Sequence, residues 1–310
     1  MTKCFPKLPR LIAFAAAFVL AGCVSLWANG QTENAATGTS GPAMKQTTLA
    51  KIKEQGYISV GFANEDPYGY ADSSGKLTGE SPEIARYVIH QIDPNVKLQG
   101  VLTEFGSLIP GLQAGRFDMV AAGMFITPKR CQQVTFANPN YTIGEALLVA
   151  KGNPKNLHSY EDIAKNPNAK LAVESGAVEG GYAKDVGVKP DQLVEVPDPP
   201  SGLAAVATGR ADAFSLTSVS IQQLVMKSGN QKVEVADPFN QPIINGSKLV
   251  NYGGFAFRKD ETALVKAVND QLATFIGSST ELNLVKPFGF TKVNVPPAGL
   301  TSAQICGGQG

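Results

Sequence analysis

Residues 57–121 read YISVGFANEDPYGYADSSGKLTGESPEIARYVIHQIDPNVKLQGVLTEFGSLIPGLQAGRFDMVA. Short apolar runs alternate here with segments whose apolar residues recur at helical spacing, which predicts strands at 57–62, 96–102 and 118–121 and helices at 81–91 and 106–114. Ser81 is expected to cap the first helix, and Pro82 suits its first position. The alternation predicts βαβ units in a mostly parallel sheet.

A second alternating series begins at residue 169. It predicts strands at 169–173, 192–196 and 211–215, and helices near 178–185 and 202–208. A strand is predicted at residues 252–258 and a helix at 263–276, and we expect both to pack with the first unit. We therefore expect an α/β protein of two lobes: lobe 1 from residues 49–147 and 246–306, and lobe 2 from 148–245.

The length of the chain agrees with this division, and its charge excludes some classes of binding partner. A chain of 310 residues fits two compact lobes of roughly 100 to 150 residues better than one domain. Its 27 basic and 26 acidic side chains nearly cancel, so no charge excess drives it toward nucleic acid or anionic lipid. The partner is expected to be a small molecule or another protein.

The N-terminus is typical of a secretory signal. A basic stretch is followed by an apolar run over residues 11–22, which is too short to cross a bilayer as a stable helix. Residues 23–48 contain too few large apolar side chains to pack and are expected to form a flexible tether. The protein is therefore expected in the periplasm or another extracytoplasmic space.

Cys23 closes this signal in the sequence Leu20-Ala21-Gly22-Cys23, which resembles a lipobox. Cys23 is accordingly a candidate for lipidation, which would anchor the protein to a membrane. The alternative is ordinary cleavage after the small-x-small site at residues 28–30. Both alternatives export the protein.

Two cysteines remain once Cys4 and Cys23 are assigned to the signal region. In an oxidising compartment Cys131 and Cys306 are expected to form a disulfide. The alternative is two buried free thiols.

Three motifs carry a resemblance to a known family: GLQAGRFD at 111–118, TPKR at 127–130 and GRADA at 209–213. They resemble the polar-amino-acid family of periplasmic binding proteins over about residues 50 to 306. The resemblance implies a bilobal type II fold with two crossover strands as a hinge, expected near 145–150 and 235–250. It also implies a monomer that delivers a small ligand to the membrane permease of an ABC importer.

Within that family the chain most resembles the ectoine and hydroxyectoine binders. The likeness rests on Cys306 and on four stretches, ANEDPY at 63–68, TEFG at 103–106, AGMF at 122–125 and KRC at 129–131. Because those proteins bind zwitterionic compatible solutes, the resemblance implies such a ligand here.

The same resemblance assigns roles to individual residues. Arg130 would form two parallel hydrogen bonds to a ligand carboxylate, for which a planar guanidinium is well suited. Phe125 and Thr217 stand where amino-acid binders usually have the groups that hold an α-ammonium. Tyr68, Phe105 and Phe125 align with the aromatic cage of the ectoine binders, whose π faces suit a delocalised cation.

Three further residues complete the expected binding set. Glu65 would accept ring N–H groups, and it is the only acid expected in the pocket. Ala177 and Val178 follow Gly176 at a turn where the family often has a hydroxyl on the ligand carboxylate. Val178 has none, so backbone N–H groups at the start of the helix would serve instead.

Other interpretations of these residues stay open. Each aromatic residue could belong to the core, Glu65 could be a solvated loop acid, and Arg130 could begin a surface helix. A polar amino-acid or betaine binder of the same fold is the alternative function.

An enzyme on this fold, such as a dehydratase, is a rival, but the sequence offers no catalytic group for it. His90 and His158 look peripheral, and no catalytic triad, metal-ligand spacing or nucleotide loop appears. We expect neither cofactor nor metal. A sensory receptor is a second rival, and it should carry a membrane-spanning helix and a signalling domain, which we do not expect here.

Overall fold

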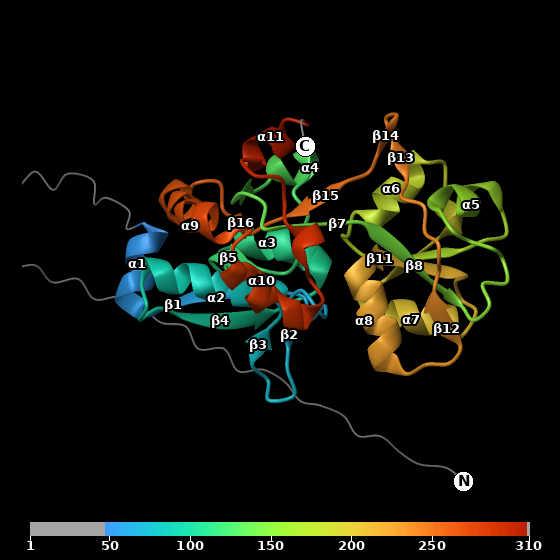
Figure 1. The fold of residues 1–310 in the computed structure, drawn as a ribbon, viewed down its shortest axis with the longest axis horizontal. Coiled ribbons are helices and arrows are strands. Elements are labelled where there is room, and N and C mark those ends of the chain that lie inside the picture. The colour runs from blue at the N-terminus through green and yellow to red at the C-terminus, as the bar shows by residue number, and fades with distance from the viewer. Residues whose placement is uncertain (1–46, 309–310) are drawn as a thin grey trace, which may run out of the picture. The chain divides into compact units, whose positions relative to one another are not determined.

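The computed structural model describes residues 47–308 and contains two five-stranded sheets, shown at the left and right of Figure 1. We call the parts built on these sheets the first and second lobes. The expected signal segment, the candidate lipidation site Cys23 and nearly all of the expected tether lie outside the described residues.

The first sheet is built around β1, whose Ile58 and Val60 are fully buried. Burying each such side chain stabilises the fold by about 1.5 to 3 kcal/mol. β1 pairs in parallel with β4 and β5, while β16 runs antiparallel to β5 and β6. The order is β4-β1-β5-β16-β6, with β1 at Tyr57–Phe62, β4 at Lys97–Leu102, β5 at Met119–Val120, β6 at Thr135–Phe136 and β16 at Ala256–Phe257.

The second sheet also mixes strand directions. β9 pairs in parallel with β10 and β11, whereas β8 runs antiparallel to both β11 and β12. The order is β10-β9-β11-β8-β12, with β8 at Glu145–Ala150, β9 at Leu171–Glu174, β10 at Leu193–Val196, β11 at Ala213–Thr217 and β12 at Val233–Val235. In each sheet four of the five strands therefore run in one direction, as expected for a mostly parallel sheet, and β16 and β8 are the strands that run against the others.

Helices flank both sheets (Figure 1). They are α1 at Thr48–Gln55, α2 at Glu80–Ile92, α3 at Leu108–Gln113, α4 at Pro128–Cys131, α5 at Tyr160–Lys165, α6 at Glu179–Asp185, α7 at Pro199–Ala207, α8 at Ser218–Ser228, α9 at Thr262–Phe275, α10 at Ser279–Val285 and α11 at Ser302–Cys306. α7 begins at Pro199 rather than near residue 202, because Asp198 caps it with its side chain.

The chain crosses between the lobes through a pair of short antiparallel strands. They are β7 at Tyr141–Ile143 and β15 at Asn251–Gly253. The crossover strands expected near 145–150 and 235–250 are therefore displaced, since β8 is an interior strand of the second sheet. Two small hairpins complete the strands, β2 at Tyr70–Ala71 with β3 at Leu77–Thr78, and β13 at Ile243–Ile244 with β14 at Ser247–Lys248.

The start of α2 differs from the expected cap. Ser81 lies inside the helix, whose N-cap is Gly79 at φ 122°, and it makes no capping bond. Its hydroxyl instead donates to Glu80 Oε2 at 2.6 Å, while the Asn140 side chain donates to Glu80 Oε1 at 3.1 Å. Glu80 is fully buried, and burial raises its pKa to about 8.

This buried carboxyl makes stability depend on pH. Because the pKa of Glu80 is higher in the folded protein than its ordinary 4.5, its contribution is fully present below about pH 4.5 and is lost as the pH rises through 8. Glu80→Gln should match the wild type in unfolding free energy at pH 4.5 and exceed it by several kcal/mol at pH 9, at about 1.4 kcal/mol per pKa unit.

Urea unfolding at a series of pH values measures this difference. Glu104→Gln, which changes an exposed acid of the same lobe, is the control and should leave the pH profile unchanged. An equal stability of Glu80→Gln and wild type at pH 9 would contradict the prediction.

The C-terminal helix is fixed to the first lobe by a disulfide. Cys131 at the end of α4 is bonded to Cys306 at the end of α11, with Cα atoms 5.8 Å apart. Of the two alternatives for these cysteines, the structure has the bonded pair.

Candidate functional site

A small cavity lies where the two lobes meet. Its volume is about 20 Å³, which is room for about one water molecule. The lining comes from both lobes and comprises Glu65, Phe105, Gly123, Phe125, Arg130, Glu174, Ala177, Val178, Glu179, Leu216 and Thr217. Seven of the eight residues expected to bind the ligand, all except Tyr68, therefore converge on one cavity.

Arg130 reaches this cavity from the short helix α4. Thr127 caps α4 by accepting the Arg130 backbone N–H at 3.2 Å, and a proline at the first helical position fixes the turn. The guanidinium donates to the carbonyl of Phe125 at 2.9 Å and to that of Gly176 in the second lobe at 3.1 Å. A guanidinium has five N–H donors, so others remain for a ligand carboxylate. Arg130 is buried and is not the start of an exposed surface helix.

The aromatic residues divide into two groups. Phe105 and Phe125 line the cavity, and the Phe105 ring lies 5.5 Å from the Arg130 guanidinium carbon, within cation–π range. Tyr68 is only 1% exposed and lies outside the lining. Its ring packs on Tyr141 and Phe290, with centroids 5.1 and 5.5 Å away. Tyr68 therefore supports the site from the core of the first lobe.

Glu65 and the start of α8 connect the two lobes. The Ser220 hydroxyl donates to Glu65 Oε1 at 2.6 Å, so Glu65 is a buried acid with a partner rather than a solvated one. Thr217 caps α8 through its side chain, which explains a hydroxyl at this position. Lys227, also on α8, forms an ion pair with Asp66.

The turn after β9 brings the second lobe close to the first. Gly176 has φ +83°, and a Cβ atom there would lie 2.4 Å from the Gly106 backbone, so only glycine fits. Ala177 and Val178 follow it into the cavity lining, and Val178 is the N-cap of α6 without a side-chain bond.

The cavity contains more acid than the sequence indicated. The expectation that Glu65 is its only acid is wrong, because Glu174 and Glu179 also line it and are each 3% exposed. Burial raises the pKa of Glu65 to about 7, of Glu179 to about 7 and of Glu174 to about 10. Glu174 ends a strand of the parallel group, and α/β proteins bind ligands at such strand ends, but this position alone does not separate a binding acid from a solvated one.

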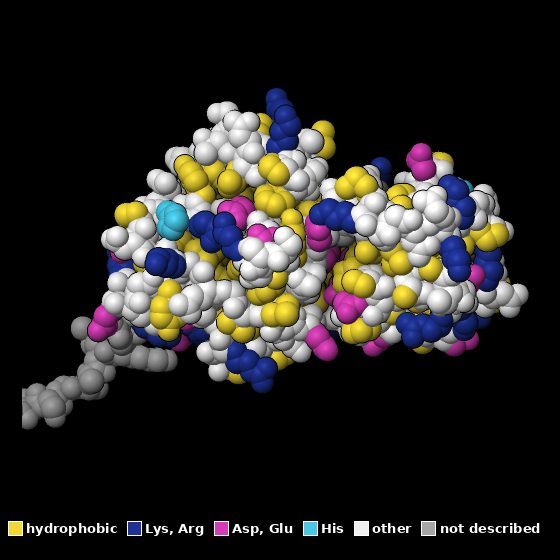
Figure 2. Space-filling view, turned by 90° about the horizontal axis from the view of Figure 1, so that it is seen from below, with side chains coloured by type: hydrophobic (Ala, Val, Ile, Leu, Met, Phe, Trp, Pro, Cys, Tyr) yellow, Lys and Arg dark blue, Asp and Glu magenta, His cyan; other side chains and the backbone are white. Residues whose placement is uncertain are grey.

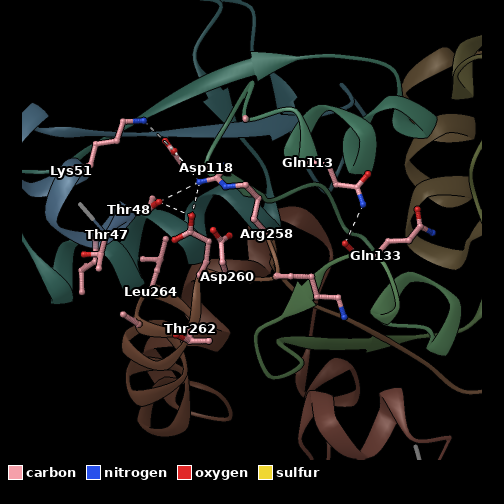
Figure 3. Close-up of a pocket in the computed structure, with 15 residues that line it drawn as sticks. Thr47, Thr48, Lys51, Gln113, Asp118, Gln133, Arg258, Asp260, Thr262 and Leu264 are labelled. Atoms are coloured by element: carbon pink, nitrogen blue, oxygen red, sulfur yellow. Dashed lines mark hydrogen bonds and ion pairs between the residues drawn. The ribbon is translucent and has the colours of Figure 1, made fainter. Parts of the chain in front are cut away.

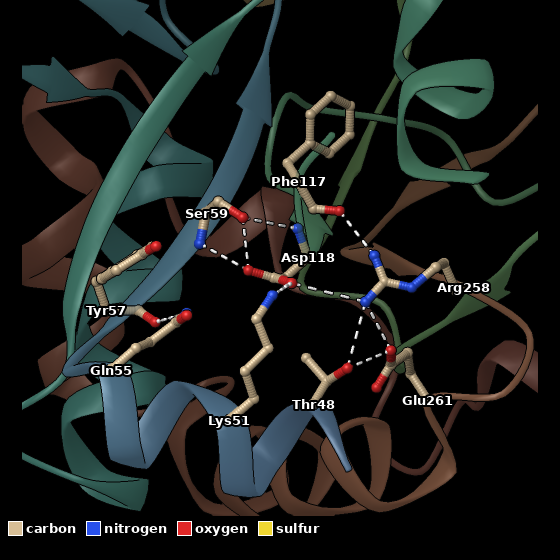
Figure 4. A network of polar contacts seen from close by, with 9 residues as sticks. All are labelled: Thr48, Lys51, Gln55, Tyr57, Ser59, Phe117, Asp118, Arg258 and Glu261. Carbon is tan, nitrogen blue, oxygen red and sulfur yellow. Dashed lines mark hydrogen bonds and ion pairs between the residues drawn. The ribbon is translucent and has the colours of Figure 1, made fainter. Parts of the chain in front are cut away.

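A larger cavity of about 870 Å³ lies beside α1 and the start of α9 (Figure 3). Its charged groups bond to one another: Asp118 accepts from Ser59 and forms ion pairs with Lys51 and Arg258, and Arg258 contacts Glu261 at 2.7 Å (Figure 4). The aspartate of the GRFD motif therefore ties the first sheet to α1 and to the segment before α9. Because these charges are already paired, we take the smaller cavity as the candidate site.

The rest of the described structure adds two observations. No group of three or more His, Cys, Asp or Glu side chains within residues 47–308 is placed to hold a metal ion, and no helix there is long and apolar enough to cross a bilayer. On the face shown in Figure 2, basic and acidic side chains are interspersed, and neither sign covers a continuous area.

Relatives of the chain support a binding role. The probable amino-acid ABC transporter periplasmic-binding protein y4tE of Sinorhizobium fredii is 36% identical over 291 residues, covering 94% of this chain and 92% of that protein. The structure of EhuB in complex with hydroxyectoine is 37% identical, with a TM-score of 0.75, covering 83% of this chain and 97% of EhuB.

A third relative connects the fold to an enzyme lineage. The ancestral amino acid-binding protein AncCDT-1, a precursor of cyclohexadienyl dehydratase, is 29% identical with a TM-score of 0.67, covering 78% of this chain and 99% of that one. Residues 58–290 match the family model of bacterial extracellular solute-binding proteins, family 3. The two lobes are thus those of a type II periplasmic binding protein, and the chain belongs to the bacterial extracellular solute-binding proteins of family 3.

Proposed function

We propose that this protein captures ectoine, hydroxyectoine or a closely related zwitterion and delivers it to an ABC importer. The observation that carries the proposal is one cavity with a guanidinium, two phenyl rings and buried carboxyls on its walls. Arg130 would bind the ligand carboxylate, Phe105 and Phe125 would cover the delocalised cation, and Glu65 would accept its N–H groups.

The cavity must enlarge for such a ligand. A six-membered ring with substituents needs far more than the volume of about 20 Å³. We expect the lobes to separate through β7 and β15 and to close on the ligand, because the crossing strands are short and the contacts between the lobes include hydrogen bonds that water can replace.

A polar amino acid is the second candidate, and a specific observation favours it. The sequence argument against an α-ammonium relied on the loss of acceptors at Phe125 and Thr217. Glu174 and Glu179 provide carboxyl oxygens in the same cavity, so an ammonium would also find acceptors there. The y4tE relative carries an amino-acid name, in agreement with this candidate.

Titration calorimetry with ectoine, hydroxyectoine, glycine betaine, glutamine and arginine separates the candidates. We expect ectoine or hydroxyectoine to bind at least tenfold more tightly than either amino acid, because rings cover a delocalised cation better than a compact, strongly hydrated ammonium. Tighter binding of glutamine or arginine than of all three osmolytes would overturn the ectoine assignment.

The remaining parts of the proposal concern the partners. The protein would act as an extracytoplasmic monomer that docks on permease subunits in the membrane. Cys23, outside the described residues, is the proposed site of a lipid anchor. Mass spectrometry of the exported protein would detect the diacylglyceryl group.

A further inference from the structure

The cavity holds three buried carboxyls and one base. Among the described residues that line it, Arg130 is the only basic side chain, while Glu65, Glu174 and Glu179 are acidic. A ligand carboxylate on Arg130 would use that positive charge, so the opposite end of the ligand would face three acids. A buried charge is costly unless it is paired and hydrogen-bonded.

Glu174 differs from the other two acids in its surroundings. Ser220 already donates to Glu65. Glu179 Oε2, like the corresponding atom of Glu174, has no hydrogen-bond partner among the described residues, but the positive charge of Arg130 offsets part of the rise that burial causes in the pKa of Glu179. Glu174 is 3% exposed, and its Oε2 has no hydrogen-bond partner among the described residues. A buried acceptor without a donor costs about 1 to 3 kcal/mol, and more when it is charged, so native structures seldom keep one without a reason.

The structure narrows what could pair with that oxygen. The guanidinium of Arg130 is directed to two backbone carbonyls, and the described residues offer no metal cluster. A partner from outside the chain that brings an N–H donor would satisfy this oxygen and would favour the ionised carboxylate. Glu65 and Glu174 come from different lobes and line the same small cavity, so the two carboxyls lie near each other.

We propose that Glu174 accepts the N–H groups of the ligand's cationic end opposite Glu65. The site then selects cations with N–H donors on two sides, such as a cyclic amidinium or a guanidinium, against quaternary ammonium compounds. A trimethylammonium group balances charge but leaves both acceptors without a donor. The inference rests on the proposed binding of a small zwitterion in this cavity, and it adds a residue that determines specificity.

The test combines a ligand panel with variants of Glu174. Calorimetry is run with ectoine, arginine and glycine betaine on wild type, Glu174→Gln, Glu174→Ala and the control Glu195→Gln, an exposed acid on the neighbouring strand β10. We expect wild type to prefer ectoine over glycine betaine at least tenfold. Glu174→Gln and Glu174→Ala should each lower the affinity for ectoine at least tenfold and reduce its ratio to the affinity for glycine betaine. The control should bind all three ligands as wild type does.

Melting curves of the four proteins show whether each variant is folded. The ligand preference of wild type can be measured even if a variant does not fold. If wild type binds ectoine and the affinities of the Glu174 variants for ectoine stay within threefold of the wild-type affinity, the inference fails and the proposed function stands. If arginine binds more tightly than ectoine and depends on Glu174, the inference stands and the ectoine assignment fails. Tighter binding of glycine betaine, or no binding of the three, overturns both.

Discussion

Replacing Arg130 by alanine is expected to weaken ligand binding by between about thirtyfold and several thousandfold. The guanidinium is buried beside Phe105 and supplies the only basic group among the described residues of the cavity lining. Removing one partner of a buried, hydrogen-bonded charge pair costs about 2 to 5 kcal/mol, which corresponds to that range of affinity. The ligand carboxylate would then be desolvated without a counter-ion.

Two further variants make this result specific. Lys129→Ala removes the neighbouring exposed cation on α4 and should leave the affinity unchanged. Arg130→Lys keeps the charge but loses the planar fork, so its affinity should lie between those of alanine and wild type. Calorimetry on folded protein decides the matter, and a loss of less than tenfold in Arg130→Ala would show that the carboxylate binds elsewhere.

Removing the disulfide is expected to have the largest effect on stability. The bond joins residues 175 positions apart, and the chain-entropy model gives about 5 kcal/mol for a loop of that length. Cys306→Ser should therefore lower the unfolding free energy by up to this amount, and it should release α11 from α4.

Urea unfolding of Cys306→Ser and wild type, each with and without reductant, checks this prediction. Reductant should destabilise wild type to the level of the variant and leave the variant unchanged. Thiol counting on unfolded, unreduced protein gives an independent result. Free thiols at both Cys131 and Cys306, or equal stability of the two proteins, would refute the prediction.

Much of the fold follows from periodicity. The strand expected at 57–62 is found at those residues, and α2, α6 and α9 begin and end within a few residues of their expected bounds. These elements are predictable because each buries one apolar face, which leaves a period in the sequence. The antiparallel strands were harder to predict from the sequence. β16 consists of only two buried residues, and its position is set by pairing with β5 and β6.

Site residues that belong to a sequence motif could be predicted, whereas those brought to the site by tertiary contacts could not. Arg130 follows a Thr-Pro turn, and Phe105 and Phe125 lie in short matching stretches, so each carried a local signal. Glu174 gives no such signal, because it is an acid at the end of a strand, where solvent would be the ordinary surroundings. In the structure it is buried, and the turn that follows it packs against Gly106 of the first lobe.

The position of β16 has a consequence for how the chain acquires its structure after export. Ala256 pairs with Val120 and Phe136, so the first sheet cannot close until a segment late in the sequence has arrived. All five strands of the second sheet lie between residues 145 and 235. Non-local pairing slows folding because loop closure must precede its contacts. The middle of the chain is therefore expected to become protease-resistant first, and the two ends of the chain join afterwards to complete the other half.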